Sequence, residues 1–264
     1  MEPSLSLILH RRYVKLHRNF TVTTEDGVAI RGVHLGERGD VLLVYCHGLF
    51  DNKNFWRVPR FVESLAEDFD AIAFDFRGHG ESEGRCTFGR EEIRDLKAVL
   101  DYAREQRYHT IVAIGASMGG AIVLRTFGHC GGLDGIVTIG AFADANHLRR
   151  LPTRLTLPLI FETEAGHALA RWARGTRLGD LRAMEQPLDL ADRVHIPLLV
   201  IHGEWDPLIE PAQATQLIDR APEPKQVVII PHGGHVASNL NDETCRLIVG
   251  WVRREVLSGG VSQT

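Results

Sequence analysis

The sequence has no long hydrophobic run: no stretch approaches the roughly 20 apolar residues that a membrane-spanning helix requires. Its first residues, Met1-Glu2-Pro3, place an acid where a signal peptide needs positive charge. Cysteine is scarce too, since the four cysteines lie far apart without a C-x-x-C pair, which argues against a zinc site and a disulfide framework. We therefore expect a cytoplasmic protein with reduced thiols and no membrane span.

An excess of basic charge is also missing. The formal net charge of the 264 residues is −4, and Lys and Arg are scattered among Asp and Glu. This distribution lacks the basic stripe that follows a phosphate backbone, so nucleic acid is not an expected partner. Hydrophobic residues make up 44% and charged residues 24%, which is typical of a globular chain. The length suits a single domain with a large core.

Short apolar runs alternate with longer segments of helical period, which predicts an α/β fold: a mostly parallel, eight-stranded sheet with helices on both faces. Residues 20–24 and 28–35 alternate in polarity around the turn Glu25-Asp26-Gly27, which predicts an antiparallel hairpin at the sheet edge. The remaining predicted strands are continuous apolar runs at 41–46, 71–74, 111–114, 136–139, 198–201 and 227–230. Helical spacing is found at 55–69, 90–107, 118–127, 211–220 and 242–256.

This rhythm fails from about residue 142 to residue 194, where an Arg- and Leu-rich stretch has helical but irregular spacing. We interpret this stretch as a helical cap inserted into a single domain of residues 1–264, whose core comprises 20–141 and 195–256. Its leucines would cover an apolar pocket. Its arginines have two possible roles: they could bind a substrate carboxylate or phosphate, or they could form a solvated face.

The segment G-A-S-M-G at residues 115–119 directly follows a predicted strand and directly precedes a predicted helix. That context is typical of a nucleophile elbow, in which the serine occupies a strained turn. Side chains at Gly115 and Gly119 would collide across the turn, so both positions need glycine. Ser117 would then face the cleft from the N-terminus of a helix, which favours negative charge. The pattern predicts Ser117 as a nucleophile.

A carboxylate and an imidazole follow two later strands. Asp206 lies in a loop after the strand 198–201, and His235 lies in the Gly-rich loop after the strand 227–230. Since the carboxyl ends of parallel strands meet at one edge, we expect both to approach Ser117 as catalytic acid and general base. Asp144 is the alternative acid, and His232 is the alternative histidine, although a structural hydrogen bond suits His232 better.

With these residues in place, the chain resembles the α/β-hydrolase superfamily from about Thr21 to Val256. Three motifs carry the likeness: H-G-L at 47–49, D-F-R-G-H-G-E-S at 75–82, and G-G-H at 233–235. They are similar to those of monoglyceride lipases and carboxylesterases. The resemblance implies that the backbone N–H groups of Leu49 and Met118 form an oxyanion hole. It also implies that Asp75 and Arg77 tie down loops, and that neither Asp75 nor His79 is catalytic.

The predicted chemistry is acyl transfer from a small-molecule carboxylic ester, with no cofactor and no metal. A serine at position 117 disfavours haloalkane dehalogenases and epoxide hydrolases, which use aspartate there. Phe50 and Phe142 flank the predicted cleft and favour an apolar acyl chain or aromatic ring, although Phe142 also suits simple core packing. Thioesterase, amidase, peptidase, perhydrolase and carbon–carbon bond hydrolase activities stay open, as does an inactive ligand-binding relative.

Overall fold

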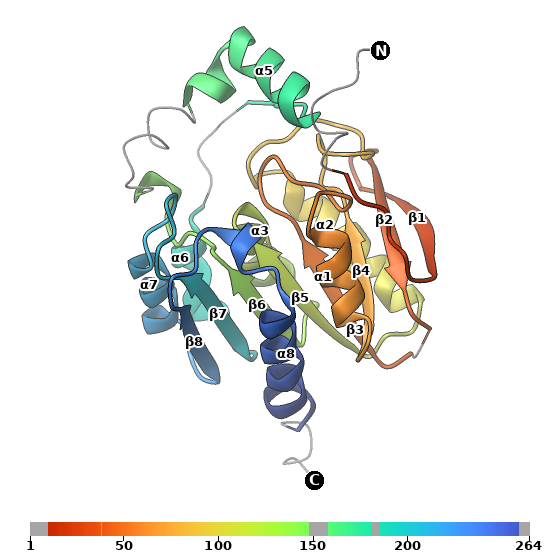
Figure 1. Ribbon diagram of the computed structural model, residues 1–264, viewed down its shortest axis with the longest axis vertical. Helices are drawn as coiled ribbons and strands as arrows, with labels where there is room; N and C mark the ends of the chain where they lie inside the picture. The colour runs from red at the N-terminus through yellow and green to blue at the C-terminus, as the bar shows by residue number, and fades with distance from the viewer. Residues whose placement is uncertain (1–9, 38, 148–157, 181–184, 259–264) are drawn as a thin grey trace.

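The computed structural model describes residues 10–37, 39–147, 158–180 and 185–258. They form one eight-stranded sheet with the order β1-β2-β4-β3-β5-β6-β7-β8 (Figure 1). The strands are β1 (His17–Thr23), β2 (Ala29–Leu35), β3 (Val41–Cys46), β4 (Asp70–Phe74), β5 (Thr110–Ala116), β6 (Gly135–Ile139), β7 (Leu198–Gly203) and β8 (Lys225–Ile230). Every predicted strand is therefore present.

The sheet is mixed but mostly parallel, which confirms the predicted fold class. β1 and β2 form an antiparallel hairpin at the edge, closed by Gly27 in a left-handed conformation (φ 83°), and β2 pairs antiparallel with β4. All other pairings, from β4 through β8, are parallel. β3 lies between β4 and β5, so the winding direction reverses there, and the crevice at such a reversal is where ligands bind in these sheets.

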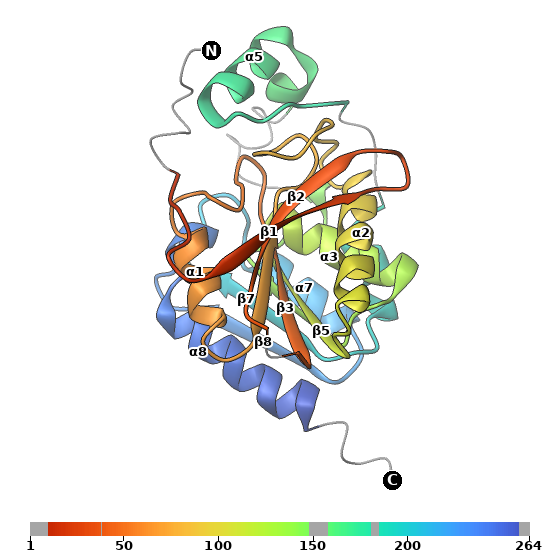
Figure 2. The same cartoon turned by 90° about the vertical axis from the view of Figure 1, so that its right-hand side faces the viewer.

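Helices cover both faces of the sheet, as Figure 2 shows. α1 (Val58–Leu65) and α8 (Asp242–Trp251) pack on one face, where Phe61 and Ile248 join a buried cluster. α2 (Glu92–Glu105), α3 (Met118–Cys130) and α7 (Ala212–Arg220) bury residues such as Leu96 and Ile122 on the other. Alternate strand residues supply the two clusters, as the two-residue period of a strand requires. Three of the four cysteines are buried in this core and all four are free, which confirms the expected thiols.

The first helix is shorter than its period suggests. The spacing predicts a helix over 55–69, whereas α1 begins at Val58. Residues 55–57 form a turn instead, and Trp56 has a positive φ of 33°, which no helical residue adopts. α8 ends at Trp251 and continues as a π-helix over Val252–Leu257. Periodicity thus placed the helices correctly but not their ends, which depend on turn geometry.

Part of the predicted cap is described. α5 (Glu164–Arg174) lies at one end of the molecule, opposite the end at which α8 lies (Figures 1 and 2). The hydroxyl of Thr163 caps it by accepting the Gly166 N–H at 2.9 Å, and Gly175 ends it in a left-handed conformation. α6 (Pro187–Leu190) packs against α3 and α7. Two segments of the predicted cap, residues 148–157 and 181–184, lie outside the described residues.

Within the described ranges, no helix combines the length and the apolar character needed to cross a membrane.

Candidate active site

Ser117 occupies a tight turn between β5 and α3. Its backbone has φ 50° and ψ −117°, a conformation that L-residues rarely adopt and that persists only where the surroundings impose it. Here the surroundings do so, because the Ser117 N–H donates to the carbonyl of Ile139 at 2.9 Å, and the Ser117 carbonyl accepts from Gly120 at 3.0 Å. The serine is thus held between the end of β6 and the first turn of α3, and its side chain is half-buried.

The glycines on either side of the serine have the predicted steric role. A Cβ added at Gly115 would lie 2.6 Å from the carbonyl oxygen of Gly119, and one added at Gly119 would lie 2.6 Å from the carbonyl oxygen of His47. Real Cβ atoms essentially never come that close to backbone atoms. The N-terminus of α3 therefore lies directly against the end of β3, which only glycine permits.

Replacing Gly119 with alanine is expected to lower the free energy of unfolding by about 1–3 kcal/mol or more, as overpacking does, because the clash is with backbone. Urea unfolding followed by circular dichroism measures this. Gly250→Ala in α8 is the matched control, since its Cβ would meet the movable end of Arg254 and alanine favours a helix. Equal stability of Gly119→Ala and the parent protein would contradict the packing argument.

Asp206 and His235 meet at the carboxyl ends of β7 and β8. The His235 Nδ1 lies 2.7 Å from the Asp206 Oδ2, although the residues are 29 positions apart. The Asp206 side chain is fully buried, whereas that of His235 retains 20% of its exposure. With Nδ1–H donating to the carboxylate, Nε2 is the nitrogen left to accept a proton.

The environment of Asp206 keeps this carboxyl ionised. Burial opposes the charge, but hydrogen bonds from His202 and His235 outweigh it and hold the pKa well below its usual range. The second oxygen, Oδ1, accepts the backbone N–H groups of Leu208 at 2.8 Å and Ile209 at 2.9 Å. The carboxylate orientation is thereby fixed from two sides.

The two alternatives lie elsewhere. Asp144 accepts the backbone N–H of Asn146 at 2.7 Å through its Oδ1, in the turn that follows β6. His232 is 71% exposed, its ring packs on Trp205 with centroids 4.3 Å apart, and its backbone N–H donates to Glu204 at 2.9 Å. The pairing in the structure is therefore that of Asp206 with His235.

The loop after β3 places the Gly48–Leu49 peptide beside Ser117. The buried His47 accepts the Phe76 N–H through Nε2 at 3.0 Å, so its Nδ1 carries the proton and donates to the Gly48 carbonyl at 2.7 Å. Burial lowers the pKa of His47 to about 4, which keeps the ring neutral. Because a trans peptide directs its C=O and N–H oppositely, the Leu49 N–H points away from His47. A Cβ at Gly48 would lie 3.3 Å from the Ser117 Cβ, so this peptide borders the serine.

Met118 is the first residue of α3 and is buried. The N–H groups of the first helical turn have no partner within the helix, so that of Met118 is available beside Ser117. Two backbone N–H groups thus border Ser117, that of Leu49 from the loop after β3 and that of Met118 from the N-terminus of α3. Such an arrangement stabilises an oxyanion without any side chain.

The D-x-R-G-H-G segment forms a buried polar network beside the site. Asp75 accepts the backbone N–H of Lys53 at 2.7 Å and its Nζ at 2.8 Å, and Arg77 pairs with Asp95 at 2.7 Å. His79 is buried, and burial lowers its pKa to about 3. The sequence analysis missed Lys53 and Asp95, because nothing in their local pattern distinguishes a buried ion pair from a surface charge.

Ser117 and His235 line one cavity of about 430 Å³, and most of its wall is apolar. Phe50 lies in this wall in a left-handed conformation (φ 62°). Phe142 also lines it, yet it is 1% exposed and stacks on Phe88 with centroids 5.7 Å apart, so it serves both pocket and core. The remaining lining residues include Leu49, Asp51, Phe55, Trp56, Arg57, Ile160, Arg174, Leu208, Ile209, Val236 and Leu240.

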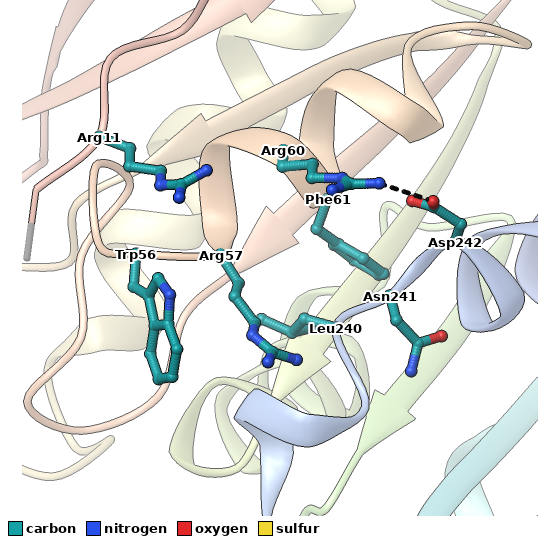
Figure 3. A pocket seen from close by; sticks show the side chains of 8 residues that line it. All are labelled: Arg11, Trp56, Arg57, Arg60, Phe61, Leu240, Asn241 and Asp242. Carbon is teal, nitrogen blue, oxygen red and sulfur yellow. Dashed lines mark hydrogen bonds and ion pairs between the residues drawn. The ribbon is translucent and has the colours of Figure 1, made fainter.

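A second pocket of about 360 Å³ adjoins this cavity and shares Trp56, Arg57 and Leu240 with it. Its lining includes Arg11, Arg57 and Arg60 (Figure 3), and Arg60 is paired with Asp242 at 2.8 Å. These arginines make the pocket polar, in contrast to the cavity that Ser117 lines.

Comparison with known proteins gives consistent results. A model of the Alpha/beta hydrolase family matches residues 41–246. The uncharacterized protein YfhR of Salmonella typhimurium is 28% identical over 229 residues, which cover 83% of this chain and 74% of YfhR. Among solved structures, an esterase of Pyrococcus furiosus superposes with a TM-score of 0.73 at 21% identity, covering 92% of this chain and 94% of the esterase. An esterase from Rhodococcus sp. does so with a TM-score of 0.67 at 20% identity, covering 91% and 98%. These structures share the fold.

Proposed function

Since the chain belongs to the alpha/beta hydrolase family, we propose that it is a serine hydrolase that cleaves carboxylic esters through an acyl-enzyme intermediate. The observation that carries the proposal is the 2.7 Å contact between His235 Nδ1 and Asp206 Oδ2 at a cavity that Ser117 also lines. That two solved structures of the same fold are esterases supports this choice of reaction.

In the first half of the proposed reaction, the Ser117 Oγ attacks the ester carbonyl carbon while the His235 Nε2 takes the serine proton. Asp206, ionised and hydrogen-bonded to Nδ1–H, stabilises the imidazolium that forms. The carbonyl oxygen becomes an oxyanion and is bound by the N–H groups of Leu49 and Met118. When the tetrahedral intermediate collapses, the C–O bond to the alcohol breaks and His235 protonates the departing oxygen.

In the second half, water replaces the alcohol. His235 accepts a proton from the water molecule as its oxygen attacks the acyl carbon on Ser117, and the same two N–H groups bind the second oxyanion. Collapse breaks the bond to the Ser117 Oγ, which regains a proton from His235, and the carboxylic acid leaves. Each residue thus returns to its starting state.

The proposed substrate is an ester with an apolar acyl or aromatic group, close to those of carboxylesterases and monoglyceride lipases. The apolar lining that includes Phe50 and Phe142 supports this. The segment of about 142–194 is proposed to be a cap on the core of 20–141 and 195–256, because Ile160 and Arg174 from it line the cavity. Small acyl groups fit a cavity of about 430 Å³ better than long chains do.

Hydrolysis of p-nitrophenyl esters from acetate to palmitate tests the reaction. We expect turnover to be highest for short and medium chains and to fall for palmitate, because the cavity is small. In parallel, a fluorophosphonate probe is expected to label the protein with one equivalent, located on Ser117 by mass spectrometry of the peptides. No turnover of any ester together with no labelling of Ser117 would contradict the proposed function.

A further inference from the structure

A positive charge lies in the mostly apolar wall of the catalytic cavity. Arg174 is the last residue of α5, and it lines the same cavity as Ser117 and His235. Its guanidinium lies over the ring of Phe55, with 4.8 Å between the guanidinium carbon and the ring centroid. This contact directs the charged end of the side chain from the cap towards the loop that follows β3.

One nitrogen of this guanidinium has an unused hydrogen-bonding capacity among the described residues. Its Nη1 is buried, and it has no hydrogen-bond partner in the part of the chain that the structure describes. Buried donors are nearly always satisfied in proteins, and a charged donor costs more when left without an acceptor. An unmet donor that lines a ligand cavity therefore indicates an acceptor that arrives with the ligand.

The other arginine in the cavity wall differs in this respect. Arg57 donates to the carbonyl of Ala237 at 3.0 Å, and its guanidinium lies 4.9 Å from the ring of Trp56. Arg57 lines both the cavity and the neighbouring pocket of Figure 3. Of the two arginines in the cavity wall, Arg174 is thus the one with a buried nitrogen that has no partner among the described residues.

The acid in the described cavity wall does not neutralise Arg174 directly. Asp51 lines the cavity and attracts Arg174 over a distance, but no ion pair within 4.0 Å joins these two described residues. The Asp51 Oδ1 accepts instead from the Asn52 N–H at 2.9 Å. Burial raises the pKa of Asp51 to about 7, so near neutral pH this carboxyl is partly protonated and opposes an incoming anion less than an ionised aspartate would.

We propose that Arg174 binds a carboxylate at the far end of the substrate's apolar chain, so that the preferred substrates are monoesters of dicarboxylic acids. The proposal rests on the proposed ester hydrolysis. The planar guanidinium matches a carboxylate in geometry, and one guanidinium balances one carboxylate charge. The second arginine of the wall, Arg57, donates to the carbonyl of Ala237, so Arg174 is the guanidinium assigned to the ligand and a singly charged carboxylate matches it.

Two esters with the same six-carbon acyl chain provide the test. Ethyl hexanoate ends in a methyl group, and monoethyl adipate ends in a carboxylate. The parent protein is expected to prefer monoethyl adipate in kcat/KM. Arg174→Gln is expected to lower kcat/KM for monoethyl adipate about 10- to 100-fold, the range for a lost hydrogen bond to a charged group, and to change that for ethyl hexanoate little. Arg174→Lys should restore part of the loss.

Arg171→Gln is the matched control, because Arg171 lies one turn earlier on α5 and is exposed. It should leave both substrates unchanged. Equal losses for both esters in Arg174→Gln, or a parent preference for ethyl hexanoate, would overturn the role of Arg174 while leaving ester hydrolysis intact. Calorimetric binding of monoethyl adipate to Ser117→Ala, with and without Arg174→Gln, separates the two claims. Binding that depends on Arg174 supports the inference even without turnover, and no binding overturns it.

Discussion

Replacing Ser117 with alanine is expected to lower kcat for p-nitrophenyl butyrate by on the order of a million-fold, the loss seen when a serine nucleophile is removed from a triad. Without Oγ there is no acyl-enzyme, and His235 has no hydroxyl proton to accept. The residual rate would come from binding and from the Leu49 and Met118 N–H groups, which the substitution leaves in place.

This loss must be separated from loss of fold. Alanine keeps the Cβ in the strained turn, and the two backbone hydrogen bonds at Ser117 do not involve the side chain. The variant should therefore unfold in urea at the parent midpoint. Ser64→Ala on α1 is the matched control, since among the described residues its hydroxyl donates a hydrogen bond to the exposed Asp242 alone, and it should retain parent activity. A Ser117→Ala protein with parent activity would exclude this serine as the nucleophile.

Replacing Asp206 with asparagine is expected to lower kcat about 10⁴-fold, as in other triads that lose the carboxylate. The geometry explains why the neutral isostere fails. Oδ1 accepts two backbone N–H groups, from Leu208 and Ile209, so the asparagine oxygen must take that position. Its amide nitrogen then faces His235 Nδ1, which must accept. The proton moves to Nε2, and the ring can no longer act as a base towards Ser117.

Asp144→Asn is the matched comparison, because this residue was the alternative acid. Its carboxylate accepts the Asn146 N–H, and asparagine oxygen can do the same, so we expect activity within a few-fold of the parent. Initial rates of p-nitrophenyl butyrate hydrolysis for both variants decide between the two acids. A large loss in Asp144→Asn with little change in Asp206→Asn would reverse the assignment.

The local sequence pattern predicted most of the secondary structure. Alternating polarity located the two strands of the edge hairpin, and apolar runs located the other six, since a strand buried on both faces is continuously hydrophobic. The five predicted helices are also present, but α1 starts late because Trp56 turns the chain first. Helix ends depend on such single residues, whose conformation is set by neighbours far away in the chain.

The candidate site likewise has features that local sequence predicted and features that it did not. The G-x-S-x-G segment indicated a tight turn because side chains at its glycines would collide, and in the structure backbone atoms do lie where those Cβ atoms would be. Lys53 and Asp95 were not foreseen as buried partners of Asp75 and Arg77, because burial of a charge depends on what packs over it. The sequence did not distinguish Arg174 from the other cap arginines, which could either bind a substrate anion or form a solvated face.

The sequence by itself determined the strand and helix periods, the turn at Ser117, and the positions of Asp206 and His235 just after their strands. These features follow from side-chain alternation and backbone sterics, which act over a few residues. Only the tertiary structure decided that His235 meets Asp206 rather than Asp144, and that Arg174 alone among the cap arginines of the described residues lines the cavity of Ser117. Such contacts join residues tens of positions apart, and only the packing of the whole sheet and its helices brings them together.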